Sequence, residues 1–353
     1  MALTERNRAL DALRGLAVLQ IVVWHNFVPY LGPQAQRVLG LTWSGVDLFF
    51  VLSGFLIGGI LLDHRTSSTY YKTFYVRRAL RILPLYFVAL AIFFWSQGER
   101  GASLVSYLTF TQNVAWSSRG GWGPDALGVT WSLAVEEQFY LIAPLLIALV
   151  PQRLLPGVIV ALITSAPILR ELAGVVYQTP HAAYMLMPCR MDSLFLGVLS
   201  AWAIRQQWFV RWRGLLLLAA PVLVSGCIWF LYARLQWDSP VMQHFGYTWL
   251  AATYACTILI LVESKSRLWV RLLAPVGIGA YSIYLFDIGV DWLAGRCGLG
   301  GGFASQVLSV PILGVVAATA WIIIERPCIR FGHRWRYEYE SSVPAKQPLP
   351  SLN

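Results

Sequence analysis

The chain has 353 residues, of which 57% are hydrophobic and only 12% are charged. Soluble globular domains carry about twice that share of charged residues, so this composition excludes an ordinary soluble protein and predicts one that resides in lipid. The formal net charge of +10 does not imply a nucleic-acid partner, because a membrane protein needs Lys and Arg on its cytoplasmic loops.

Apolar runs long enough to cross a bilayer core as helices recur along nearly the whole sequence. They predict an all-α, polytopic bundle of about ten transmembrane helices. We place these near residues 12–31, 43–62, 79–96, 136–150, 156–174, 186–204, 214–234, 246–263, 273–294 and 304–324. The first run has no small-residue cleavage site after its basic start, so we expect it to be retained rather than removed as a signal peptide.

The distribution of basic residues predicts the orientation of the bundle. Groups of basic residues fall on alternate loops, whereas the loops between them carry mainly the single arginines Arg37, Arg100, Arg119, Arg234 and Arg296. The positive-inside rule then places both termini in the cytoplasm. We expect a membrane domain over residues 1–336 and a flexible cytoplasmic tail over 337–353.

The first apolar run contains two ionisable residues, Arg14 and His25. At about 100° and 1.5 Å per residue, a helix brings them to within about 20° of one face and separates them by about 16 Å along its axis. Such groups are costly in lipid, so each is a functional candidate or part of a structural pair. An imidazole can accept a proton from a hydroxyl at neutral pH, which makes His25 the candidate general base. The alternative is a plain hydrogen bond between helices.

The second run and the approach to the third add further charged candidates. Asp47 in GVDLFFVLSGFLIG either orients the imidazole or is a helix-terminal charge stabilised by the macrodipole. Arg77, Arg78 and Arg81 in FYVRRALRILP form either a phosphate site or a positive-inside anchor. The sequence has no GxxxxGK[ST] or GxGxxG motif, which argues against ATP or a dinucleotide as the ligand.

The fourth run opens with two carboxylates, Glu136 and Glu137, in WSLAVEEQFYLIAPLL. They point about 100° apart on a helix, so we expect one to bind an acceptor hydroxyl and the other to orient His25 or cap the helix. Trp131 and Tyr140, with Asn113 upstream, are candidate acceptor-binding residues, although interfacial aromatic belts explain such rings equally well.

The sixth run carries Arg190 and Asp192 in RMDSLFLG, which we interpret as a structural ionic cluster that locks helices together. The five cysteines form no CxxC pair and no metal-ligand spacing, so we expect packing roles for them and no metal ion.

Six motifs in chain order resemble those of the bacterial acyltransferase-3 family of membrane O-acyltransferases: R-x10-H at Arg14 and His25, GVDLFFVLSGFLI, FYVRRALRILP, WSLAVEEQFYL, RMDSLFLG and YSIYLF. The resemblance extends from about residue 8 to the IERP at 324–327. It implies an enzyme of the bacterial cytoplasmic membrane that moves an acyl group, commonly acetyl, from acyl-CoA to a hydroxyl. The acceptor is expected to contain carbohydrate, such as a cell-surface polysaccharide or its lipid-linked precursor.

Individual roles follow from the resemblance. His25 corresponds to the catalytic histidine, Arg14 to its partner arginine, and Arg78 with Arg81 to the pair that faces the donor. Relatives often carry a histidine where this chain has Asp287, so Asp287 is expected to pair with a cation or to belong to a different acceptor site. No appended SGNH-type esterase domain is visible, so we expect the membrane domain alone to deliver the acyl group.

The predicted mechanism places the donor phosphates on Arg77, Arg78, Arg81 and Arg14. His25 then deprotonates the acceptor hydroxyl while Asp47 or Glu137 orients its ring. A covalent acyl-histidine is a second route. The rival function is a transporter or flippase, in which the same intramembrane charges form a pathway without chemistry. The sequence leaves open the acceptor, the acyl chain and the oligomeric state.

Overall fold

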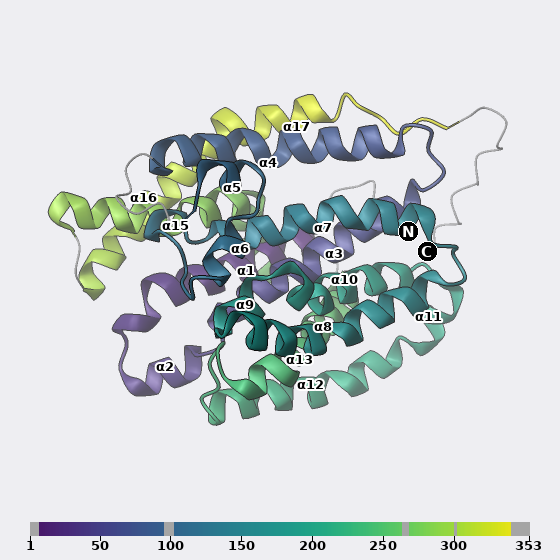
Figure 1. Ribbon diagram of the computed structural model, residues 1–353, viewed down its shortest axis with the longest axis horizontal. Helices are drawn as coiled ribbons and strands as arrows, with labels where there is room; N and C mark the ends of the chain where they lie inside the picture. Colours follow the sequence, from purple (N-terminus) through teal and green to yellow (C-terminus); the bar gives the residue numbers. More distant parts are fainter. Residues whose placement is uncertain (1–6, 95–101, 263–267, 300–301, 340–353) are drawn as a thin grey trace.

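The computed structural model describes residues 7–94, 102–262, 268–299 and 302–339, and Figure 1 shows them as one elongated bundle of helices. The described part contains no β-strand, which confirms the all-α class. Helix α1 (Arg8–Asn26) begins at one end of the bundle, which we call the proximal end, and finishes at the opposite, distal end.

The remaining helices run mostly along the same axis (Figure 1). The longer ones are α3 (Gly45–Asp63), α4 (Tyr70–Phe94), α7 (Thr130–Leu149), α8 (Leu155–Tyr177), α10 (Met191–Ala203), α12 (Gly214–Tyr232), α13 (Tyr247–Leu261), α14 (Leu268–Ile278), α15 (Ala280–Ala294) and α16 (Phe303–Ala320). The shorter ones are α2 (Pro33–Leu39), α5 (Leu104–Leu108), α6 (Gln112–Ser117), α9 (Pro180–Met185), α11 (Gln207–Trp212) and α17 (Arg326–Gly332).

Six described helical segments are long and apolar enough to cross a membrane, and a bent pair brings the number to seven. The expected ten spans are therefore not confirmed, although a helix occupies each expected position. Helices α1 and α4 carry several charged residues along their length, and α10 has only 13 residues. The bent pair is α14 with the segment that begins at Ala280, and its two parts meet at 64°. The cytoplasmic location of the termini remains a prediction.

Two close helix crossings fix the centre of the bundle. A Cβ atom added to Gly54 of α3 would lie 1.9 Å from the carbonyl oxygen of Leu194 in α10, and one added to Gly277 of α14 would lie 1.7 Å from that of Asp11 in α1. Only glycine permits such contacts, because any side chain would push the backbones apart. Helix α3 also packs closely on α1, because a Cβ atom added to Gly45 would lie 2.5 Å from the carbonyl oxygen of Ala17, and Phe50 and Phe55 of α3 are fully buried.

The last described residues pack against the proximal end. The carbonyl oxygen of Arg336 accepts hydrogen bonds from Thr69 and Thr73, each at 3.0 Å, and the Tyr337 ring stacks on His64 with ring centroids 3.8 Å apart. The expected tail over 337–353 thus begins with residues held against α3 and α4. Residues 340–353 lie outside the described part of the chain.

Candidate active site

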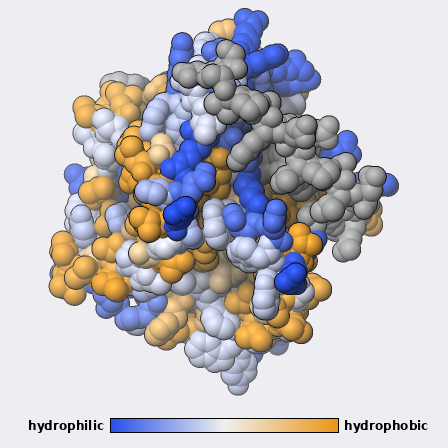
Figure 2. Space-filling model, turned by 90° about the vertical axis from the view of Figure 1, so that its right-hand side faces the viewer, coloured by the Kyte–Doolittle hydropathy of each residue, from blue (hydrophilic) through white to orange (hydrophobic). Residues whose placement is uncertain are grey.

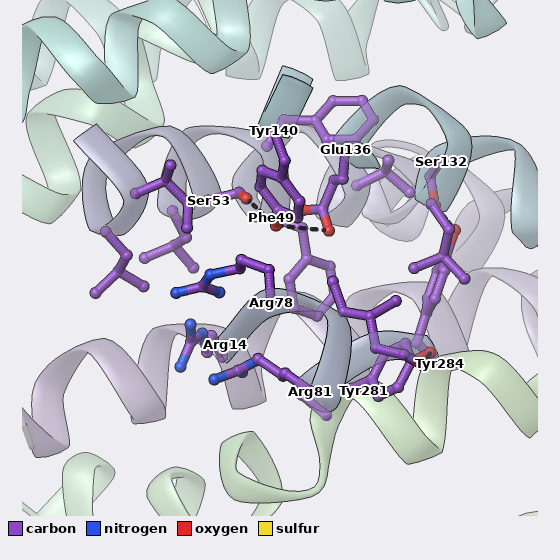
Figure 3. A pocket seen from close by; sticks show the side chains of 18 of the residues that line it. Arg14, Phe49, Ser53, Arg78, Arg81, Ser132, Glu136, Tyr140, Tyr281 and Tyr284 are labelled. Atoms are coloured by element: carbon purple, nitrogen blue, oxygen red, sulfur yellow. Dashed lines mark hydrogen bonds between the residues drawn. The ribbon is translucent and has the colours of Figure 1, made fainter. Parts of the chain in front are cut away.

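A cavity opens between α1, α3, α4, α7 and α15 and encloses about 840 Å³ of empty space, including its open mouth. Its apolar walls carry a small set of polar side chains (Figure 3). These are Arg14, Ser53, Arg78, Arg81, Ser132, Glu136, Tyr140, Tyr281 and Tyr284. A mostly apolar cleft with few convergent polar groups is the usual form of a small-molecule site.

Three arginines gather in this cavity. Arg14 comes from α1, whereas Arg78 and Arg81 lie three residues apart on one face of α4 (Figure 3). Arg14 has one weak ion pair, at 3.6 Å from Asp11, and no described carboxylate pairs with Arg78 or Arg81. Glu136 and Glu325 act electrostatically on these arginines without forming an ion pair with them. The guanidinium groups therefore still repel one another, and the cavity favours an anion that could bridge them. The proximal face correspondingly shows hydrophilic side chains between hydrophobic flanks (Figure 2).

Helix α7 presents one polar face to the cavity. Ser132, Glu136 and Tyr140 are four residues apart and so lie above one another. The Tyr140 hydroxyl donates to Glu136 Oε2 at 3.3 Å and shares a hydrogen bond with Ser53 Oγ at 2.8 Å. Glu136 and Tyr140, expected to bind the acceptor, therefore lie in the same cavity as the arginines.

His25 lies at the distal end of α1 and is not part of the cavity wall. Its Nδ1 is 2.7 Å from Oδ2 of Asp287 in α15, and Asn26 Nδ2 donates to the other oxygen, Oδ1, also at 2.7 Å. The Asp287 side chain is fully buried, whereas 28% of the His25 side chain is exposed. A carboxylate next to Nδ1 favours the imidazole tautomer in which Nδ1 carries the proton. The lone pair of Nε2 is then free to accept a proton.

This contact corrects the expected orientation of His25. Neither Asp47 nor Glu137 contacts the imidazole in the described structure. Asp47 Oδ1 instead accepts hydrogen bonds from Arg190 and, at 3.3 Å, from Ser193. Glu137 Oε1 is buried without a described hydrogen-bond partner. Their depth in the membrane predicts that either carboxylate could reach His25, but helix packing directs both side chains away from the imidazole.

Arg190 and Asp192 lie in a buried ionic network at the distal side of α3 and α10. Asp192 Oδ2 accepts from Arg170 Nη1 at 2.8 Å and from Thr248 at 2.6 Å. The Arg190 guanidinium pairs with Asp47 and lies 4.2 Å from the centroid of the Tyr247 ring. All of these side chains except Thr248 are buried, so the network ties α3, α8, α10 and α13 together.

Three further expected site residues lie outside the cavity. Arg77 donates to the carbonyl oxygen of Trp335 through Nε at 2.9 Å and Nη2 at 2.6 Å, so it holds the C-terminal segment rather than facing the three arginines. Asn113 is buried, with Nδ2 bonded to the Met185 carbonyl oxygen at 3.0 Å. Trp131 is buried between the rings of Phe50 and Tyr184. Neither of the last two presents a free surface to an acceptor.

Ser132 and Tyr284 line the cavity next to the part of α15 that leads to Asp287. Their hydroxyl oxygens are 2.6 Å apart, and the Tyr284 hydroxyl also donates to the Val129 carbonyl oxygen at 3.1 Å. Asp287 lies one helical turn beyond Tyr284 on α15, so along this helix the cavity lining leads directly to the carboxylate that holds the imidazole. Neither residue is among those predicted from the sequence, although Tyr281, Tyr284 and Asp287 recur at helical spacing in YSIYLFD.

Comparisons with known proteins agree with this architecture. Residues 7–326 match the model of the family described as "Acyltransferase domain". A putative peptidoglycan O-acetyltransferase YrhL of Bacillus subtilis is 27% identical over 92% of this chain and 55% of its own length. Peptidoglycan O-acetyltransferase OatA of Listeria monocytogenes is 34% identical over 38% of this chain. O-acetyltransferase OatA of Staphylococcus aureus is 33% identical over 42% of it.

The chain aligns with little more than half of the Bacillus protein and with 23% and 26% of the Listeria and Staphylococcus proteins. No solved structure matches the chain. The family match covers nearly the whole sequence and the described helices that build the cavity, so the chain belongs to the acyltransferase-3 family, as its ordered motifs predicted.

Proposed function

We propose that this protein is a membrane O-acyltransferase that moves an acetyl or similar acyl group from acyl-CoA to a hydroxyl of a carbohydrate acceptor. The observation that carries the proposal is the pairing of His25 with the buried carboxylate of Asp287, one helical turn beyond a cavity that contains three arginines. A base and an anion site at opposite ends of α1 suit a donor that has phosphates at one end and a reactive thioester at the other.

The donor is proposed to enter from the proximal end, which would face the cytoplasm. Its phosphates would bind Arg14, Arg78 and Arg81, because arginine forks match phosphate oxygens. The pantetheine arm would extend along α1 toward His25, a rise of about 16 Å over eleven residues. The open volume of the cavity and its apolar walls support this placement.

The chemistry at the distal end follows from the imidazole. His25 Nε2 would take the proton of the acceptor hydroxyl while that oxygen attacks the thioester carbonyl carbon. The new C–O bond forms, the C–S bond breaks, and CoA leaves as the thiolate, which then takes the proton from the imidazolium. Asp287 would keep the ring in the required tautomer and stabilise its transient positive charge, with Asn26 holding the second carboxylate oxygen.

A carbohydrate acceptor is proposed from the names of two relatives, which are described as peptidoglycan O-acetyltransferases. The hydroxyl would approach from the distal end, where part of the His25 side chain is exposed. Direct transfer needs both substrates at His25 together, whereas an acyl-histidine would form without the acceptor.

The test uses purified protein reconstituted in sealed lipid vesicles, which separate two aqueous compartments, with acetyl-CoA labelled in the acetyl group and a peptidoglycan-derived acceptor. We expect acceptor-dependent release of free CoA thiol and of labelled ester, and loss of both in His25→Ala while CoA binding persists. Transport of the acceptor without thiol release would overturn the proposal in favour of a transporter. Labelled enzyme trapped without acceptor would replace direct transfer by the acyl-histidine route.

A further inference from the structure

A second pocket lies at the distal end, between α2 and the end of α12, and it encloses about 460 Å³ of empty space including its opening. Two arginines, Arg37 and Arg234, and two glutamines, Gln36 and Gln236, line it together with the apolar side chains of Phe230 and Leu235. It is separate from the arginine cavity, with which it shares no lining residue.

The charge of this pocket is uncompensated. No Asp or Glu belongs to its lining, and neither Arg37 nor Arg234 pairs with a carboxylate anywhere in the described chain. Both side chains are exposed. Two guanidinium groups beside two amides provide forked donors for the oxygens of a phosphate, and a phosphate would also relieve their mutual repulsion.

The backbone holds Arg234 at the pocket in a conformation that arginine rarely adopts. Its φ of 54° lies in the left-handed region, directly after the last turn of α12, where helices commonly end on glycine. The amide of Leu235 closes this turn on the carbonyl oxygen of Phe230 at 3.0 Å. A strained position occupied by a charged residue fits a binding role better than a structural one, since glycine would serve the turn alone.

The surroundings of the pocket favour a ligand with an apolar chain. Helix α12 is a candidate membrane span, and its last turns, next to the pocket but outside its lining, carry exposed apolar side chains: Ile228 is 60% exposed and Tyr232 is 80% exposed. A hydrocarbon chain beside α12 would cover this surface while its phosphate reached Arg37 and Arg234. A free phosphate ion would leave the apolar surface unused.

The pocket is connected to the catalytic end of α1. The short helix η1 (Val28–Tyr30) follows α1 directly, and Gln36 Nε2 of α2 donates to the Val28 carbonyl oxygen at 3.2 Å. A ligand held by α2 would therefore lie close to the residues that directly follow His25 in the chain. This is the end of the bundle from which the acceptor is proposed to approach.

We propose that this pocket binds the phosphate of an amphiphile at the distal membrane surface. On the basis of the proposed function, this pocket anchors a lipid-linked carbohydrate acceptor near His25. The same chemistry is offered by a bulk anionic phospholipid, and the experiment separates these two sources.

The experiment measures binding by native mass spectrometry of the full chain in detergent micelles, without any acyl donor. The probes are a polyprenyl phosphate, phosphatidylglycerol and inorganic phosphate. The test variant combines Arg37→Gln with Arg234→Asn, because asparagine tolerates the left-handed backbone but lacks the charge. The control is Arg296→Gln, which removes an exposed arginine that follows α15 and stacks on Trp292 outside the pocket.

We expect the double variant to bind polyprenyl phosphate at least tenfold more weakly than the wild type and the control variant. Preference for polyprenyl phosphate over phosphatidylglycerol assigns the site to a lipid-linked acceptor, whereas equal loss for both assigns it to bulk anionic lipid and refutes the acceptor anchor. Unchanged binding in the double variant overturns the site itself, and binding of inorganic phosphate as tight as that of the lipids overturns its assignment to an amphiphile. Because no donor is present, these outcomes are independent of whether acyl transfer occurs.

Discussion

Asp287 accepts a hydrogen bond from Nδ1 of His25 at 2.7 Å, across 262 positions of sequence. The contact forms because α14 and α15 meet at a bend of 64°, which turns α15 toward the distal end of α1. Asn26, the residue after His25, bonds the second carboxylate oxygen, so both oxygens of Asp287 are held by consecutive residues of one helix. The carboxylate therefore has no freedom to rotate away from the imidazole.

Replacing Asp287 by asparagine should lower kcat by about 10²–10⁴-fold, because an amide at this position can stabilise the wrong tautomer and cannot stabilise the imidazolium. The KM for acetyl-CoA should change little, since the arginine cavity is untouched. Steady-state kinetics with varied donor would measure both constants.

The matched control is Asp291→Asn, one turn further along α15, where the carboxylate accepts from Gln306 Nε2 at 2.6 Å. It should retain nearly full kcat. Equal losses in the two variants would show that Asp287 acts on the fold rather than through His25.

The sequence predicted the helices and much of the cavity. Arg14, Arg78 and Arg81 were all expected to face a donor, and they line one cavity because fixed helical spacing determines which residues share a face. The charge pattern alone could not show that Arg77, the neighbour of Arg78, points toward Trp335 instead.

The partner of His25 was not predictable in the same way. Asp47 and Glu137 were plausible by depth in the membrane, but which helices are neighbours depends on side-chain packing far from either residue. Gly277 allows α14 to approach α1 closely, and the bend after it places Asp287 at the imidazole. Trp131 and Asn113 are likewise predicted to contact the acceptor, yet the fold buries both side chains.

Arg78→Gln and Arg81→Gln should each raise the KM for acetyl-CoA by roughly tenfold or more, because a charged hydrogen bond to phosphate is worth about 1.5–3 kcal/mol. Arg77→Gln is the control, since Arg77 bonds a backbone carbonyl oxygen outside the cavity. Direct titration with CoA at one fixed ionic strength would measure the affinities, because low salt exaggerates charge effects. Unchanged affinity in both cavity variants would contradict the phosphate site.

The hydroxyl pair of Ser132 and Tyr284 should control access between the two ends of the site. Both hydroxyls line the cavity, and Tyr284 precedes Asp287 by one helical turn, so we expect their hydrogen bond to restrict the approach of a thioester to His25. Tyr284→Phe keeps the ring and removes the hydroxyl, so we expect more acceptor-independent hydrolysis of acetyl-CoA and a lower yield of transfer per donor consumed. Thiol release compared with ester formation would measure that ratio.

Tyr254→Phe is a suitable control for this experiment, because Tyr254 forms a hydrogen bond of the same length, 2.6 Å, with Ser44 away from the cavity. Its ratio of hydrolysis to transfer should equal that of the wild type. If hydrolysis and transfer fall together in Tyr284→Phe, the hydroxyl assists the reaction itself and does not close the passage.

The last described residues, 337–339, should detach from the proximal end at acidic pH. His64, which follows the span ending at Asp63, has a pKa below its ordinary 6.5, chiefly because of burial and also because of Arg77, while Asp63 acts in the opposite direction. Its ring stacks on Tyr337, and Nδ1 is 2.6 Å from the Tyr339 hydroxyl. Because folding depresses this pKa, the docked segment is fully stabilised above pH 6.5 and loses stability as the pH falls through the folded pKa.

Hydrogen exchange of the Glu338 amide, which donates to Thr69 Oγ1 at 3.0 Å, would report this release after correction for the intrinsic pH dependence of exchange. We expect protection to fall below pH 6.5 in the wild type and to stay constant in His64→Phe, which preserves a stacking ring but cannot take a proton. Arg77 donates to the Trp335 carbonyl oxygen, and this bond should hold the residues before Tyr337 in place at both pH values. A loss of protection in His64→Phe equal to that of the wild type would place the titrating group elsewhere than at His64.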